Sequence, residues 1–195
     1  MTRLARRLFA DRCASSAAEF ALVLPLLLAF LIGTIDVGRL MWTWNRAEKA
    51  TQMGVRYAIV TNMVPATLAT QNFALSNGVP GGDPVPTSQF SQTTCDSTGC
   101  TNGWGYDATA FAGIVTRMQA AMPEVTAANV EIDYENVGLG YAGDPLGPDV
   151  APLVTVRLKD LSFHPMAMMI FDVAIDLPDF RAALTSEDGE GTVSN

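Results

Sequence analysis

The sequence contains very little of the chemistry on which enzymes and metal sites depend. Its 195 residues include one histidine, His164, and three cysteines. No Gly-x-Ser-x-Gly motif surrounds a serine, no glycine-rich phosphate-binding loop precedes a helical pattern, and no paired histidines suggest a metal. Charged residues make up only 16% of the chain, and the formal net charge is −8. We therefore expect no catalysis and no cofactor, and the acidic balance argues against nucleic acid as a partner.

The few cysteines also restrict the kinds of site that the chain can build. Cys95 and Cys100 lie in a region, residues 63–106, that is rich in glycine, proline and small polar residues. Two thiolates without a second cysteine pair or a nearby histidine are too few for a zinc site, and the spacing is not the Cys-x-x-Cys of a redox centre. We predict a structural disulfide between Cys95 and Cys100 in an oxidising compartment.

The chain does have one long apolar run, near its N-terminus. Residues Phe20 to Ile35 carry no charge until Asp36 follows. As a helix rising about 1.5 Å per residue they span roughly 24 Å, a little less than the hydrocarbon thickness of about 30 Å. The long side chain of Arg39 can reach the interface and extend the span. No Ala-x-Ala-like site follows the run, so we predict a membrane-spanning helix and not a secretory signal that is removed.

Two residues distinguish this segment from a plain anchor. Glu19 stands directly before the run, where an ionised carboxylate is costly unless it is paired, although its position alone equally allows it to lie among lipid headgroups. Pro25 removes one helical hydrogen bond inside the run. Because neighbouring groups compensate for this loss in a bilayer, we predict a kink at Pro25 rather than a break.

The residues around Glu19 resemble known signal and pilin sequences. A basic leader, small residues at positions 14–16 and the sequence Ala-Ala-Glu-Phe resemble the class III, prepilin-type signal, which a membrane-embedded aspartic peptidase cuts before the apolar segment. Over residues 17–40 the chain also resembles the TadE-like minor pilins, or pseudopilins, of the tight adherence (Flp) pilus, which are related to type IV pilins. The shared features are the glutamate-phenylalanine-alanine start at Glu19, the proline Pro25 and the Gly38-Arg39 pair.

This resemblance implies a function in pilus assembly. It implies a cut between Ala14 and Ser15, with alanine where the family usually has glycine, and recognition of Glu19 and Phe20 by the peptidase. Glu19 would then pair with the free α-amino group of a neighbouring subunit. The implied role is a minor pilin that helps to initiate or assemble the pilus for surface attachment. The implied partners are the prepilin peptidase, other pilins and minor pilins, the inner-membrane assembly platform and membrane lipid.

The remaining sequence predicts one α+β domain attached to a long helix. We expect a leader over 1–14, a helix over 15–62 that spans the membrane to about residue 40, a periplasmic domain over 63–186 and a disordered acidic tail over 187–195. Beyond Asp36 the apolar positions recur at three- and four-residue steps, so this half of the helix is amphipathic.

Within the domain, local patterns predict one further long helix and several strands. Asp107 is a candidate helix N-cap before an apolar pattern that ends at Pro123. Alternating residues predict strands over 130–135 and 153–158, with a last strand within 173–185. We expect a small antiparallel sheet with one face covered by the first helix. Acidic residues in strand 130–135, Asp133 among them, are expected on its solvent face. Asp144 and Asp149 could bind calcium, but they lack the dense Asp-x-Asp-x-Asp-Gly spacing of a dedicated loop, so we expect a solvated turn.

The distribution of charge predicts how the chain is oriented in the membrane, and one alternative function remains open. Arginines precede the apolar run, which places the N-terminus in the cytoplasm and the domain in the periplasm of a bacterial inner-membrane, single-pass protein, or in the pilus. The alternative is a periplasmic ligand- or cell-wall-binding module on an uncleaved signal anchor, with loops 78–105 and 138–152 as its binding surface. The processing of the N-terminus distinguishes the two hypotheses.

Overall fold

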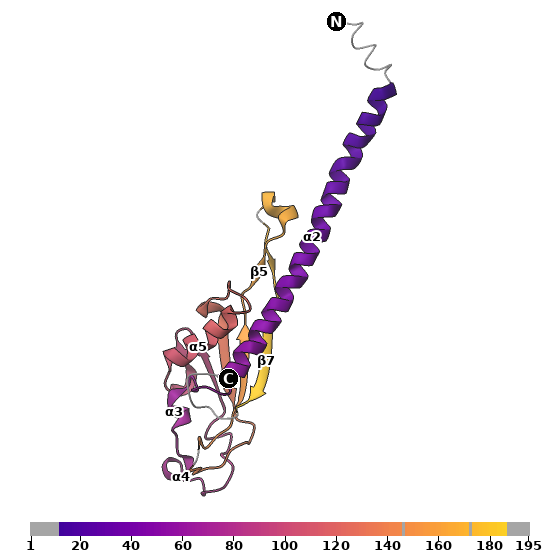
Figure 1. The fold of residues 1–195 in the computed structure, drawn as a ribbon. Helices are drawn as coiled ribbons and strands as arrows, with labels where there is room; N and C mark the ends of the chain where they lie inside the picture. The colour runs from indigo at the N-terminus through magenta and orange to yellow at the C-terminus, as the bar shows by residue number, and fades with distance from the viewer. Residues whose placement is uncertain (1–11, 146, 172, 187–195) are drawn as a thin grey trace. The chain divides into compact units, whose positions relative to one another are not determined.

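The computed structural model describes residues 12–145, 147–171 and 173–186 (Figure 1). Most of the predicted leader and all of the predicted tail over 187–195 lie outside the described residues. The chain divides into two compact units, Met1–Trp42 with Ser162–Ile175 and Thr43–Leu161 with Asp176–Asn195. A long N-terminal helix and a small antiparallel sheet make it an α+β protein, which confirms the predicted fold class.

Helix α2, Arg12–Ala58, contributes to both units. It begins within the predicted leader and ends before the predicted end at residue 62. The backbone beyond it has other partners: the Val64 N–H donates to the Tyr134 hydroxyl, and the Val64 carbonyl accepts from the Asp107 N–H, at 2.8 Å. These bonds direct the chain towards the sheet and away from the helix axis.

The second unit is built on a five-stranded sheet in the order β2-β1-β3-β4-β7. All of its neighbouring strands are antiparallel. The strands are β1 (Gln92–Asp96), β2 (Gly99–Cys100), β3 (Val130–Glu135), β4 (Leu153–Leu158) and β7 (Phe180–Thr185). The predicted strands over 130–135 and 153–158 are confirmed.

Helices in this unit cover one face of the sheet. The second half of α2 buries the predicted apolar positions Ala47, Ala50, Gly54 and Ala58, and the ring of Trp44 meets Phe180 of β7 edge to face at 5.0 Å. Helix α5, Ala108–Gln119, begins at Asp107, whose carboxylate accepts from the N–H groups of Thr109 and Ala110. This N-cap confirms the prediction for Asp107.

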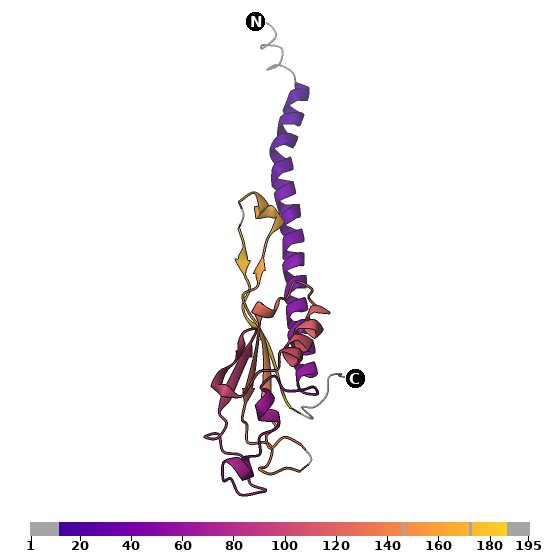
Figure 2. The same ribbon diagram turned by 90° about the vertical axis from the view of Figure 1, so that its left-hand side faces the viewer.

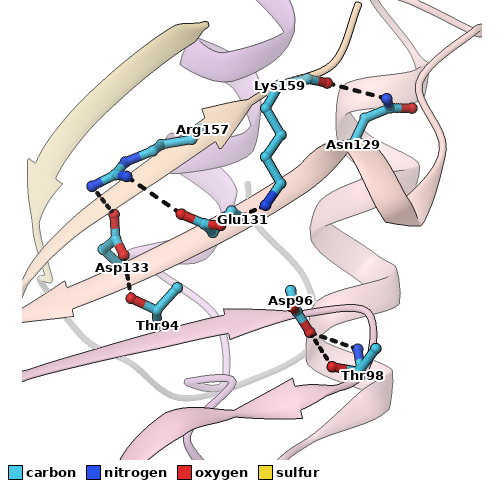
Figure 3. Close-up of polar contacts among 8 residues, drawn as sticks. All are labelled: Thr94, Asp96, Thr98, Asn129, Glu131, Asp133, Arg157 and Lys159. Atoms are coloured by element: carbon cyan, nitrogen blue, oxygen red, sulfur yellow. Dashed lines mark hydrogen bonds and ion pairs between the residues drawn. The ribbon is translucent and has the colours of Figure 1, made fainter.

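Charged side chains line the other face of the sheet and pair across strands (Figure 3). Arg157 of β4 lies 2.6 Å from Asp133 and 3.3 Å from Glu131, both on β3. Lys159 lies 2.7 Å from Glu131, and the Thr94 hydroxyl of β1 donates to Asp133 at 2.6 Å. Asp133 is buried beneath these partners, so the expectation that it faces solvent was wrong. Alternation identifies the face on which a side chain lies but not the long side chains that cover it.

Short elements occupy the region that the sequence assigns to loops. The connection after α2 contains two short helices, α3 (Ala66–Ala69) and α4 (Phe73–Ser76), and a 3-10 turn, η1 (Thr101–Gly103), follows the hairpin β1–β2. The hairpin itself was not predicted, because β1 is short and its buried positions include a polar residue, Thr93. A second 3-10 turn, η2 (Ala127–Asn129), precedes β3.

Asp149 holds part of this loop region together. It is buried and accepts hydrogen bonds from the N–H groups of Phe73, at 2.6 Å, and Asp144, at 3.1 Å. The expected solvated turn was therefore wrong, because Asp149 serves as a buried acceptor that joins its own loop to the first residue of α4.

Candidate functional site: the apolar half of α2

The first half of α2 exposes almost all of its side chains. Every residue from Ser16 to Ile32 is exposed among the described residues. These include large apolar side chains such as Leu22, Leu26 and Phe30. The helix is long and apolar enough to cross a membrane. Exposed apolar side chains around the whole circumference are stable in lipid but not in water.

The predicted cleavage and recognition residues lie in the first turns of this helix. Ala14 and Ser15 are in the helical segment that starts at Arg12. One turn further on, Glu19 is exposed, and Phe20 beside it is 65% exposed. Within the part of the chain that the structure describes, the Glu19 carboxylate has no hydrogen-bond or ion-pair partner.

Pro25 lies inside α2, and the helix continues on both sides of it. The helix therefore continues past Pro25 although the proline lacks the N–H of one helical hydrogen bond. The kink itself stays a prediction.

A polar cluster lies where the apolar run of α2 ends. We define the Asp36 cluster as Asp36 and Arg39 of α2 with Phe163, Met166 and Ala167 of the segment that follows β4. Asp36 is only 7% exposed. Its carboxylate accepts from the backbone N–H groups of Met166, at 2.8 Å, and Ala167, at 2.7 Å.

Arg39 completes the Asp36 cluster on its C-terminal side. Its guanidinium donates to the Asp36 carboxylate at 3.0 Å and lies 5.2 Å from the centroid of the Phe163 ring. The Asp36 charge is thus paired and hydrogen-bonded, which offsets the cost of a carboxylate next to an apolar segment.

The Asp36 cluster attaches a hairpin to α2 within the first unit. Its strands are β5 (Ser162–Phe163) and β6 (Ile175–Asp176), and the 3-10 helix η3 (Met166–Phe171) lies between them. The two N–H groups that donate to Asp36 belong to the first turn of η3. At the start of a helix such groups have no acceptor within the helix itself. Asp36 is therefore the cap of η3.

Sequence analysis did not predict the Asp36 cluster. The three-residue spacing of Asp36 and Arg39 allows an ion pair on one helix face, so this contact could have been predicted from the sequence. The N–H donors, however, lie 130 residues further along the chain, and no local pattern connects them to Asp36. Arg39, expected to reach the membrane interface, contacts Asp36 and the Phe163 ring, and its place at the interface stays a prediction.

The predicted cysteine pair lies outside this segment, in the sheet unit. The structure joins Cys95 of β1 to Cys100 of β2 in a disulfide, with the two residues directly opposite in the hairpin. The bond joins the edge strand β2 to its neighbour β1. Across the described ranges, no three His, Cys, Asp or Glu side chains gather in a way that could hold a metal ion.

Taken together, the exposed apolar helix and the α+β unit define a class of protein. One N-terminal apolar helix, followed by a domain with its own core, fits a single-pass membrane anchor. Within this class, residues 14–56 match the model of the family described as TadE-like protein. The match falls entirely within α2, confirms the resemblance noted in the sequence, and is consistent with a TadE-like, pilus-associated protein. No curated protein and no solved structure matched the chain.

Proposed function

We propose that this chain is a minor pilin, or pseudopilin, of a tight adherence (Flp) pilus. The observation that carries the proposal is the TadE-like match over a helix whose apolar surface is exposed and whose N-terminal end carries Glu19. In this role α2 anchors the subunit in the inner membrane, with its N-terminus in the cytoplasm and the sheet unit in the periplasm. The role is structural, and no step of it requires an enzymatic activity of this chain.

The exposed surface of α2 supports assembly as well as anchoring. Side chains such as Leu22, Leu26 and Phe30 contact no other part of the described chain closely enough to be buried. They can pack against lipid before assembly and against the helices of other pilins afterwards, because both surroundings are apolar. The further partners that we propose are the prepilin peptidase and the inner-membrane assembly platform.

Glu19 has two roles in this proposal. The peptidase first recognises Glu19 and Phe20 and cuts between Ala14 and Ser15. The new α-amino group of one subunit then pairs with the Glu19 carboxylate of its neighbour. An ion pair of this kind offsets the cost of a carboxylate in lipid and sets the axial register of two helices.

Processing of the N-terminus is the first test of the proposed function. We expect the protein extracted from membranes to begin at Ser15 when the prepilin peptidase is present and at Met1 when it is deleted. Ala14→Gly, which restores the usual family residue, should be cut at the same bond, whereas Ala14→Leu should block the cut because the peptidase subsite takes only small side chains. A start at Met1 in both strains would contradict the pilin role and support the anchored binding module.

The subunit-pairing role of Glu19 is tested separately. We expect Glu19→Leu to insert in the membrane and yet to support few or no pili, because the neighbouring α-amino group then lacks its partner. Pili are counted by electron microscopy, and membrane insertion is checked by carbonate extraction. Glu48→Gln is the matched control, since it removes an exposed carboxylate from the same helix in the other unit. Normal piliation with Glu19→Leu would refute the pairing.

A further inference from the structure

The hairpin that carries η3 presents apolar side chains beside the end of the apolar run of α2. Met166 is 54% exposed and Met168 is 47% exposed. The sequence from Pro165 to Phe171 contains no charged residue. A solvent-exposed turn is usually polar, so an apolar turn needs a partner of low polarity.

The Asp36 cluster determines the direction in which this hairpin runs. Phe163 lies against Arg39, whereas Met166 and Ala167, further along the chain, bond to Asp36. As the chain advances from Phe163 to Met166 it moves towards the N-terminal end of α2. Figures 1 and 2 both show β5 and the helical turn after it running beside α2 in this direction. The hairpin therefore points at the apolar run.

The position of the hairpin matches the edge of a bilayer around α2. Asp36 directly follows Ile35, the last residue of the apolar run. The run spans about 24 Å at about 1.5 Å per residue, several Å less than a hydrocarbon core of about 30 Å. Trp42, 64% exposed in the same unit, is of the residue type that favours the membrane interface.

We propose that the η3 tip, residues 165–171, inserts into the lipid interface of the membrane that α2 spans, in the leaflet at the C-terminal end of the apolar run. This inference depends on the membrane anchoring that the proposed function assigns to α2. Burial of the methionine side chains supplies the driving force, and their flexibility suits a disordered acyl layer. The Asp36 cluster holds the tip at that depth, so the subunit contacts the bilayer at two places and its helix cannot rotate freely.

Lipid is favoured over a protein partner by the continuity of the apolar surface. The exposed side chains of Met166 and Met168 continue the exposed apolar surface of the first half of α2, which ends one residue before Asp36. The backbone N–H groups at the start of η3 are already satisfied by Asp36, which removes the main polar cost of placing this turn in an interface.

The depth of the tip is measured with nitroxide labels on the full chain in phosphatidylcholine–phosphatidylglycerol vesicles. Cys13→Ser removes the remaining thiol outside the disulfide, and a label is placed at Met168→Cys. Leu26→Cys in the apolar run is the lipid control, and Leu75→Cys, an exposed apolar residue of the sheet unit, is the aqueous control. Accessibility to oxygen, which partitions into lipid, is compared with accessibility to a water-soluble nickel chelate.

We expect an oxygen-to-nickel ratio several-fold higher at position 168 than at position 75, and closer to that at position 26. A ratio at position 168 equal to that at position 75, with position 26 in lipid, would overturn the insertion while leaving the anchor intact. Protection of position 168 from both reagents would overturn it in favour of a contact with protein. A water-accessible label at position 26 would refute the anchor itself and the proposed function with it.

A second variant tests the positioning by Asp36. Asp36→Ala removes the acceptor for both N–H groups of η3, and we expect the ratio at position 168 to fall several-fold while that at position 26 stays unchanged. Thr34→Ala is the matched control, since the Thr34 hydroxyl bonds only to the carbonyl of Leu31 in the same helix. An unchanged ratio at position 168 in Asp36→Ala would show that Asp36 does not hold the tip.

Discussion

Tyr134 connects the sheet to the chain that leaves α2. Its side chain is fully buried in β3, and its hydroxyl accepts a hydrogen bond from the N–H of Val64 at 3.2 Å. Burial raises the pKa of Tyr134 far above its usual range, so the phenol stays protonated at any physiological pH. A single hydroxyl thus satisfies the buried backbone N–H of Val64, which lies beyond the C-terminal end of α2.

Removal of this hydroxyl should destabilise the sheet unit. We expect Tyr134→Phe to lower the free energy of unfolding by about 1–3 kcal/mol, because the buried N–H of Val64 loses its acceptor. Urea unfolding of the detergent-solubilised chain, followed by circular dichroism, measures the change. Tyr141→Phe is the control, since Tyr141 is largely exposed, and it should leave the midpoint unchanged. Equal midpoints for both variants would contradict the role given to Tyr134.

At the scale of elements, α2 packs closely against α5 and the sheet at Gly54. A Cβ atom on Gly54 would lie 2.8 Å from Cγ of Met118 in α5 and 3.3 Å from Cγ1 of Val156 in β4. Met118 and Val156 are fully buried, so neither has free space into which it can move. Gly54 therefore determines how closely the helix, α5 and the sheet pack together.

Gly54→Ala tests this close packing. We expect it to lower the free energy of unfolding of the sheet unit by about 1–3 kcal/mol, because the added methyl group overpacks the core. The same urea titration measures the loss. Gly38→Ala is the matched control in the same helix, where nothing lies within 4 Å of the added atom, and it should be neutral or slightly stabilising. A stable Gly54→Ala protein would show that the core yields more easily than the contacts imply.

At the scale of the whole molecule, the formal net charge is −8, so the stability of the protein is best tested at low pH, where its carboxylates become protonated. Hydrogen bonds from the hydroxyl and the N–H of Thr98 hold the pKa of Asp96 below its usual value. A hydrogen bond from Arg46 likewise lowers the pKa of Glu124, although that carboxylate is largely exposed and contributes less.

These two lowered pKa values predict how stability depends on pH. Because each carboxylate binds its proton more weakly in the folded state than in the unfolded state, its contribution is fully present only above pH about 5, where the carboxylates are ionised in both states. The contribution is lost as the pH falls through the folded pKa. We expect the urea midpoint to drop between pH 5 and pH about 3, and Asp96→Asn to show a smaller drop over the same range. If the urea midpoint of Asp96→Asn falls with pH in the same way as that of the unmodified protein, Asp96 does not contribute to the loss of stability.

Much of this architecture was predictable from local patterns. The apolar run after Glu19, the N-cap at Asp107 and the alternation over 130–135 and 153–158 each depend on neighbouring residues alone, so the sequence contains them in full. The TadE-like resemblance also lies within one continuous segment, where the family match later fell. The hairpin β1–β2 was missed because its five-residue first strand is too short and too polar to show a pattern.

The sequence by itself determined the class of the protein, because length, hydropathy and helical or strand periodicity act over short distances along the chain. The tertiary structure alone decided the pairing of Asp36 with the first turn of η3, the burial of Asp133 under Arg157, and the use of Asp149 as an acceptor for the distant N–H of Phe73. Each of these contacts joins residues far apart in sequence. A buried carboxylate always requires hydrogen-bond donors, but only the folded chain determines which donors reach it.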